Sequence, residues 1–141
     1  MRCTVPPYPK LLTLLTLLFG VFVFVWLGTE EDSVWLVSLL GLGISLLATT
    51  HGLFRLSGRT FAARVWIVAA IALGALLGAG AVAATILLMI MKTSMHSHIF
   101  PDYPFLLISG IFERLPAWTA AGALFGLAGA LLIYRPIVDP D

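Results

Sequence analysis

Charged residues are scarce in this chain of 141 residues, where Asp, Glu, Lys and Arg together make up 11%. Soluble domains carry about 25%. Hydrophobic residues make up 60% of the chain, and its mean hydropathy is +1.05. A soluble fold of this size would keep apolar surface that it cannot bury, whereas lipid accepts an apolar exterior. The net charge of +1 leaves no basic footprint for nucleic acid, so we expect none as a partner.

Several catalytic groups are also missing. The single cysteine, Cys3, excludes an internal disulfide and the cysteine pairs of thiol-oxidising four-helix enzymes. No Asp, Glu, Lys, Arg or His lies in the middle of a long apolar segment, and such a group would mark a proton- or ion-coupled transporter. Ser38 and Ser45 lie within the second apolar segment, far from the histidines at 96 and 98, and we find no glycine-rich phosphate loop. We therefore expect no enzyme, no catalytic residues and no metal site.

Long apolar segments are present four times, at residues 11–27, 34–54, 65–91 and 115–133. A helix needs roughly 20 residues to cross a hydrocarbon core of ~30 Å, and unpaired backbone is too costly there for irregular structure. The chain is thus predicted to be an all-α integral membrane protein. It forms a single domain, 1–141, with four transmembrane helices in an up-down-up-down bundle. A signal peptide at the first segment is disfavoured because no small-x-small cleavage site follows it.

The basic residues sort to one side of this topology. Six of the eight lie at the end that holds both termini: Arg2, Lys10, Arg55, Arg59, Arg64 and Arg135. Lys92 and Arg114 lie at the other end, with five acidic residues. The positive-inside rule then places both termini in the cytoplasm. We expect a multi-pass protein of the plasma (inner) membrane or of an equivalent energy-transducing membrane.

Tryptophan prefers the headgroup region and tests this topology. Trp26, Trp35 and Trp118 fall at the expected outer boundary, and Trp66 falls at the inner one. We interpret these four residues, and Tyr103 in the outer loop, as membrane-interface anchors. Asp32 or Ser33 is expected to cap the second helix.

Small residues at helical spacing predict where the helices approach each other, because burial of leucine gains little in lipid. Residues 74–78 and 122–126 each form a Gly-xxx-Gly motif, Gly-Ala-Leu-Leu-Gly and Gly-Ala-Leu-Phe-Gly. We interpret the likeness as shared packing composition rather than duplication. The expected packing residues are Gly41, Ser45, Gly74, Gly78, Gly122, Gly126 and Gly129.

The outer loop, residues 92–114, is the segment with the most varied chemistry. Pro101 and Pro104 interrupt the third helix. The apolar residues that follow predict a short helix over 104–114, which lies in the outer interface or against a partner protein.

The three histidines are candidate cofactor ligands: His96 and His98 in this loop, and His51 at the inner end of the second helix. An interfacial loop and a helix-end residue are the simpler interpretations. About 27 residues at ~1.5 Å separate the levels of His51 and His96 by roughly 40 Å, so the two cannot ligate one haem. The sequence requires no cofactor.

The sequence therefore predicts a non-catalytic accessory or structural subunit of a larger membrane complex, acting in assembly, stabilisation or helix packing. Its expected partners are other membrane subunits and lipid. One alternative is a subunit that binds pigment, haem or metal through His96, His98 or His51, with any pigment or haem shared with a neighbouring subunit. A third is a small channel or lipid-handling protein, and the polar Ser/Thr stripes are the only feature in its favour.

Overall fold

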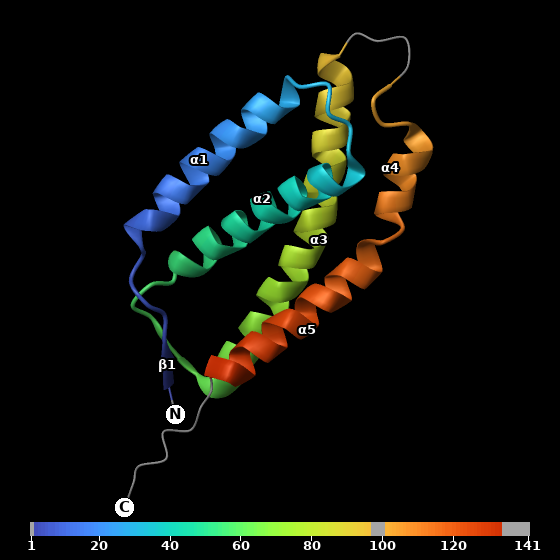
Figure 1. The fold of residues 1–141 in the computed structure, drawn as a ribbon. Coiled ribbons are helices and arrows are strands. Elements are labelled where there is room, and N and C mark those ends of the chain that lie inside the picture. The colour runs from blue at the N-terminus through green and yellow to red at the C-terminus, as the bar shows by residue number, and fades with distance from the viewer. Residues whose placement is uncertain (1, 97–100, 134–141) are drawn as a thin grey trace, which may run out of the picture.

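The computed structural model describes residues 2–96 and 101–133, and about three quarters of them are helical. Figure 1 shows the elements in chain order. They are β1 (Arg2–Thr4), α1 (Lys10–Leu27), α2 (Val34–Phe54), β2 (Thr60–Ala62), α3 (Ala63–Met95), α4 (Phe105–Phe112) and α5 (Leu115–Ile133).

Four of these helices, α1, α2, α3 and α5, are long and apolar enough to cross a membrane. The prediction of an all-α membrane protein with four such helices is confirmed at this level. The observed α3 is longer than the predicted segment, 65–91. Its 33 residues, at ~1.5 Å each, give a helix about 50 Å long. Hydropathy places the C-terminal end of this helix too early, because Lys92 is polar and yet belongs to the helix.

Helix α3 is central, since it packs along both α5 and α2 (Figure 1). Against α5 the contact is backbone on backbone. A Cβ atom added at Gly74 would meet the carbonyl group of Gly122, and one added at Gly78 would meet that of Trp118. A Cβ at Gly126 would likewise meet the carbonyl of Ala70. Only glycine permits so close an approach.

The contact between α2 and α3 combines close approach with one hydrogen bond between the helices. A Cβ at Gly41 would meet Thr85 and the backbone of Ala81. One helical turn further on, Ser45 is buried and its Oγ donates to the carbonyl oxygen of Leu77 at 2.7 Å. Gly129 differs from the other expected packing residues, because a Cβ there would meet no described atom within 4 Å.

Helix α1 packs much more loosely on α2 and α3 than these pairs do. Its buried residues are Leu12, Trp26 and Leu27, near its two ends. In its middle, the Phe19 ring lies against Gly43 of α2. Contacts at its ends therefore hold α1 in place.

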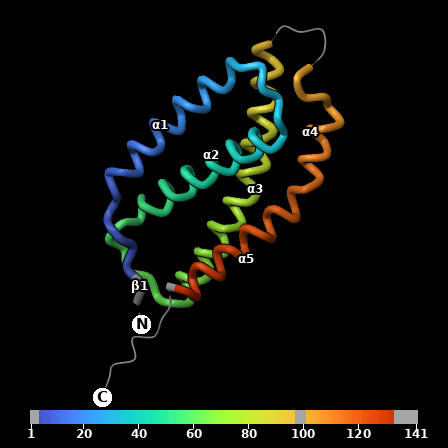
Figure 2. Tube along the Cα trace, in the orientation of Figure 1, coloured from blue at the N-terminus to red at the C-terminus, as the bar shows by residue number. Residues whose placement is uncertain are grey.

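A short β ribbon, which hydropathy does not predict, joins the N-terminal segment to the start of α3. Strands β1 and β2 pair antiparallel with Cys3 opposite Phe61. In Figure 2 the N-terminal segment reaches the stretch of chain that leads from α2 into α3. The pairing continues where Val5 N–H donates to the Arg59 carbonyl oxygen at 3.1 Å. Gly58 closes the turn with φ of +76°, a left-handed conformation that favours glycine.

The expected short helix is present with narrower bounds, since α4 begins after Pro104 and ends at Phe112. Pro104 precedes the helix and no side chain caps it. Of the two candidate caps for α2, Ser33 is the one that the structure places at the N-cap, with Leu36 N–H donating to its Oγ at 3.5 Å.

Candidate functional site

The candidate histidines lie at different ends of the molecule. His51 lies near the C-terminal end of α2, and His96 follows the last residue of α3. His98 lies outside the described residues. The structure therefore does not bring His51 and His96 together.

His51 is half-buried and connects α2 to α1 and to the segment before α1. Its Nδ1 lies 3.0 Å from the Tyr8 hydroxyl, and its Nε2 lies 2.8 Å from Thr16 Oγ1. The Tyr8 hydroxyl also lies 3.0 Å from Thr13 Oγ1, and Thr16 Oγ1 donates to the Leu12 carbonyl oxygen at 2.8 Å. The Tyr8 ring packs on the imidazole, with centroids 5.7 Å apart.

The donors in this network determine the tautomer of a neutral His51. Thr16 uses its only hydrogen on Leu12, so His51 Nε2 must donate to Thr16. Nδ1 of a neutral ring is then the acceptor, and the Tyr8 hydroxyl donates to it. A metal or haem iron bound to either nitrogen would have to displace Tyr8 or Thr16.

His96 lies beside an acid at the outer end. Its Nδ1 is 2.8 Å from Asp102 Oδ2 across the loop. Over residues 2–96 and 101–133, no group of three or more His, Cys, Asp or Glu side chains is arranged to hold a metal ion. In the described loop, the pair thus fastens residue 102 to the end of α3.

Lys92 is the residue that the sequence analysis missed. We expected a surface cation at the outer face, but its side chain is fully buried. Its Nζ donates to the carbonyl oxygens of Trp26, at 3.4 Å, and Glu31, and lies 4.1 Å from the centre of the Trp26 ring. The ammonium group therefore holds the end of α1 and the following turn against α3. The signal in the sequence was a lysine just after the third apolar segment, at the same end as the last residues of the first segment. The final carbonyl groups of a helix have no partner within it and need a donor from elsewhere.

Tyr103 packs in the same region and is 2% exposed. We expected an interface anchor, but the ring instead joins a buried cluster with Trp26, Met89 and Ile111. Its hydroxyl has no hydrogen-bond partner among the described atoms. Burial, together with the negative charges of Asp32, Asp102 and Glu31, raises the pKa of Tyr103 to about 12.

The four tryptophans expected as interface anchors have different surroundings. Trp35 is 83% exposed and Trp118 is 38% exposed, so both offer surface to lipid. Trp26 is buried beneath Lys92, and its indole N–H has no partner in the described structure. Trp66 is half-buried at the opposite end of α3 from Lys92.

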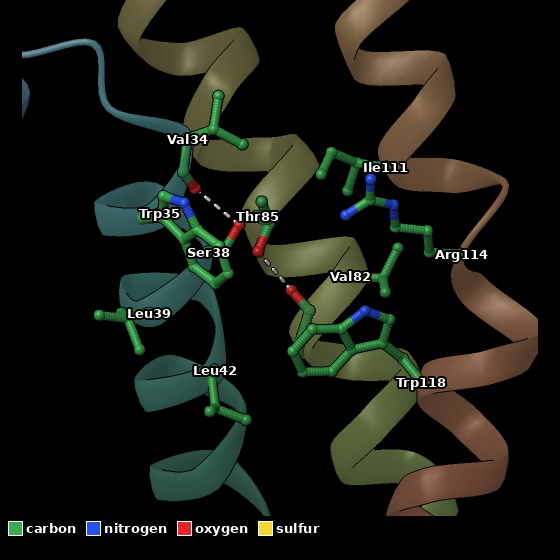
Figure 3. Close-up of a pocket in the computed structure, with 11 residues that line it drawn as sticks. Val34, Trp35, Ser38, Leu39, Leu42, Val82, Thr85, Ile111, Arg114 and Trp118 are labelled. Atoms are coloured by element: carbon green, nitrogen blue, oxygen red, sulfur yellow. Dashed lines mark hydrogen bonds between the residues drawn. The ribbon is translucent and has the colours of Figure 1, made fainter.

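The most enclosed cavity described lies between α2 and α5, with α3 as its floor. It measures about 130 Å³, and Figure 3 shows the side chains around it. Val34, Leu39 and Leu42 form the α2 wall, while Ile111 and Trp118 lie across from them. The cleft exists because α2 and α5 each pack on α3 rather than on each other.

Arg114, between α4 and α5, lies at the mouth of this cleft. Its guanidinium extends over the cleft from the α5 side, above Val82 and Trp118 (Figure 3). No carboxylate of the described residues lies within ion-pair distance of it. Among the described residues, Arg114 thus has no acidic partner and lies over an apolar cleft.

Comparison of the chain with protein-family models, with curated proteins and with solved structures finds no match.

Proposed function

We propose that this chain is a non-catalytic subunit of a larger membrane complex, acting in assembly, stabilisation or helix packing. We place it in the plasma (inner) membrane or an equivalent energy-transducing membrane. Its four long helices run up-down-up-down, with both termini in the cytoplasm and α4 in the outer interface.

The apolar surface of α4 carries this proposal. The helix fastens itself to the protein through Ile111, which is buried. It presents Phe105 and Leu106 outward, 84% and 83% exposed, with Phe112 at 61%. Eight residues are too few to span the hydrocarbon core, so this face suits the headgroup boundary or a partner subunit.

The ends of α3 support the proposed topology. The β ribbon fastens the N-terminal segment to the start of α3, among the basic residues of the 55–64 loop. Lys92 fastens the acidic turn after α1 to the end of α3. The basic and acidic segments thus lie at opposite ends of one long helix, as the positive-inside rule expects of inner and outer loops.

Four of the packing glycines contact another helix of the same chain, which reduces the surface that is left for a partner subunit. Gly74, Gly78, Gly122 and Gly126 contact backbone within this chain, so they are not free to contact another subunit. Exposed apolar side chains remain on all five described helices, but α4 alone among them is too short to span the hydrocarbon core, so α4 is the surface proposed for a partner.

The test is the size of the particle that contains the tagged chain after mild detergent extraction from native membrane. On a native gel we expect a band well above the monomer. The double variant F105A/L106A should shift much of the chain to the monomer position. The matched control is L17A/F24A, which truncates two exposed side chains of α1 and should leave the large band unchanged.

A wild-type chain that runs as a monomer at native expression would overturn the subunit proposal. Equal loss of the large band in both double variants would show that α4 is not the contact surface.

A further inference from the structure

The cleft between α2 and α5 has walls that suit a hydrocarbon chain. Its side walls are aliphatic and aromatic, and two hydroxyl groups lie on its surface. Ser38 Oγ donates to the Val34 carbonyl oxygen at 2.7 Å, and Thr85 Oγ1 donates to that of Ala81 at 2.8 Å. Both hydroxyl hydrogens are therefore used within their own helices (Figure 3). An apolar occupant therefore leaves neither of these two hydroxyl donors unpaired.

The length of the cavity suits an acyl chain. Along α2 the cavity runs from Val34 to Leu42, which at ~1.5 Å per residue is about 12 Å. One leaflet contributes about 15 Å to the hydrocarbon core, so the cavity covers most of the depth that one acyl chain occupies.

A second apolar cavity of about 210 Å³ lies one turn further along α2, from Leu46, and is also floored by α3 and walled by α5. Leu77 and Phe125 are among its lining residues. Apolar surface of the same three helices is thus present beyond Leu42 as well.

The mouth of the cleft supplies the charge that a lipid phosphate needs. Arg114 has no acidic partner in the described part of the chain, and a guanidinium donates two parallel hydrogen bonds to a phosphate. Trp35 and Trp118 flank the same opening, and such indole rings favour the headgroup level.

We propose that this cleft binds one phospholipid, with an acyl chain between α2 and α5 and the phosphate on Arg114. The site needs the chain to lie in a membrane but does not need it to be a subunit of a complex. It therefore stands or fails separately from the function proposed above.

The test is native mass spectrometry of the purified protein in mild detergent, titrated with dipalmitoyl phosphatidylglycerol. Dipalmitoylglycerol, with the same chains and no phosphate, and glycerol 3-phosphate, with no chains, are titrated in parallel. We expect one tightly bound phospholipid per chain, with about tenfold weaker binding of dipalmitoylglycerol, since a charged hydrogen-bonded contact is lost. Glycerol 3-phosphate should not bind measurably.

Two variants test the two halves of the site. R114Q removes the charge, and S38L fills the cleft while sacrificing only a hydrogen bond within α2. Each should weaken phosphatidylglycerol binding about tenfold. The matched controls are R64Q, an exposed arginine at the other end of α3, and S94L, whose hydroxyl also bonds within its own helix, to Ile90. Both should bind as the wild type does.

The proposal is overturned if dipalmitoylglycerol binds as tightly as the phospholipid, if R114Q binds like the wild type, or if R64Q and S94L weaken binding equally. Tight binding of glycerol 3-phosphate would instead assign Arg114 to free phosphate. A photo-crosslinker at Leu39 that labels a protein and no lipid in native membrane would assign the cleft to a partner's side chains.

Discussion

The middle of α3 and its outer end are held by different interactions. In the middle, Gly74 and Gly78 let the backbone of α5 approach so closely that no Cβ fits between them. At the outer end, Lys92 reaches carbonyl oxygens of Trp26 and Glu31, and Tyr103 is buried beside them. One region depends on shape and the other on polar groups.

The difference follows from the surroundings. Lipid gives helices no hydrophobic reason to associate, so the middle depends on close contact and is sensitive to added volume. The end of α3 that holds Lys92 carries more polar groups, so charge and hydrogen bonds contribute more of the free energy there. Each region should therefore respond to its own kind of change.

Added volume in the middle should have the largest effect. Gly78→Leu places a side chain against the Trp118 carbonyl group and should separate α3 from α5. We expect a loss of about 3 kcal/mol in the free energy of unfolding, measured by denaturant titration in detergent micelles. The control Gly129→Leu, which meets no described atom within 4 Å, should change stability by less than ~0.5 kcal/mol. Similar losses in both variants would contradict the proposed role of close contact.

Removing the buried charge should have the next largest effect. Lys92→Met keeps an apolar stem but loses both hydrogen bonds to the end of α1 and its turn. We expect a loss of about 2 kcal/mol and faster amide hydrogen exchange in residues 24–33. Lys10→Met, at an exposed position, is the control. Unchanged exchange in Lys92→Met would mean that the turn is held by other contacts.

Alkaline pH should weaken the outer end through Tyr103. Its pKa is raised to about 12 in the folded chain, against about 10 when unfolded, so the unfolded state loses its proton first. Below pH 10 Tyr103 is protonated in both states and its contribution to the free energy of unfolding is fully present. As the pH rises from 10 toward 12, the free energy of unfolding falls by about 2 kcal/mol, because the unfolded state alone loses the proton there.

Tyr103→Phe tests this pH dependence. The variant should match the wild type at pH 7, because the hydroxyl has no described partner, and should lose less stability between pH 10 and 12. A wild-type stability that is flat from pH 10 to 12 would contradict the burial of Tyr103.

The smallest effect is expected at the inner end, where hydroxyls and one imidazole hold α1 to α2. Nitrogen NMR of labelled protein at a pH where His51 is neutral should show the Nε2–H tautomer. Thr16→Val should lose that preference and about 1 kcal/mol of stability. Thr50→Val is the control, since its hydroxyl bonds only within α2. A dominant Nδ1–H tautomer in the wild type would contradict the assigned hydrogen-bond directions between His51, Thr16 and Tyr8.

Residues that titrate or carry charge were the hardest to place from sequence. Lys92 and Tyr103 sit at the ends of apolar segments, where hydropathy cannot separate a snorkelling side chain from a buried one. Their burial depends on the 28–33 turn and the 101–104 segment, which reach α3 from distant parts of the sequence. The β ribbon was also not predicted from the sequence. Its strands have three residues each, which is too short to show the alternating pattern of a strand.

Length and hydropathy by themselves determined that four helices can cross a membrane, because an uncharged run of about 20 residues has few alternatives to a helix in lipid. Only the tertiary structure decided which faces meet. Many small residues compete for contact, and Gly122 lies against Gly74 while Gly129 lies against nothing described. It also decided that α2 and α5 each pack on α3 rather than on each other, which is what opens a cleft beneath Arg114.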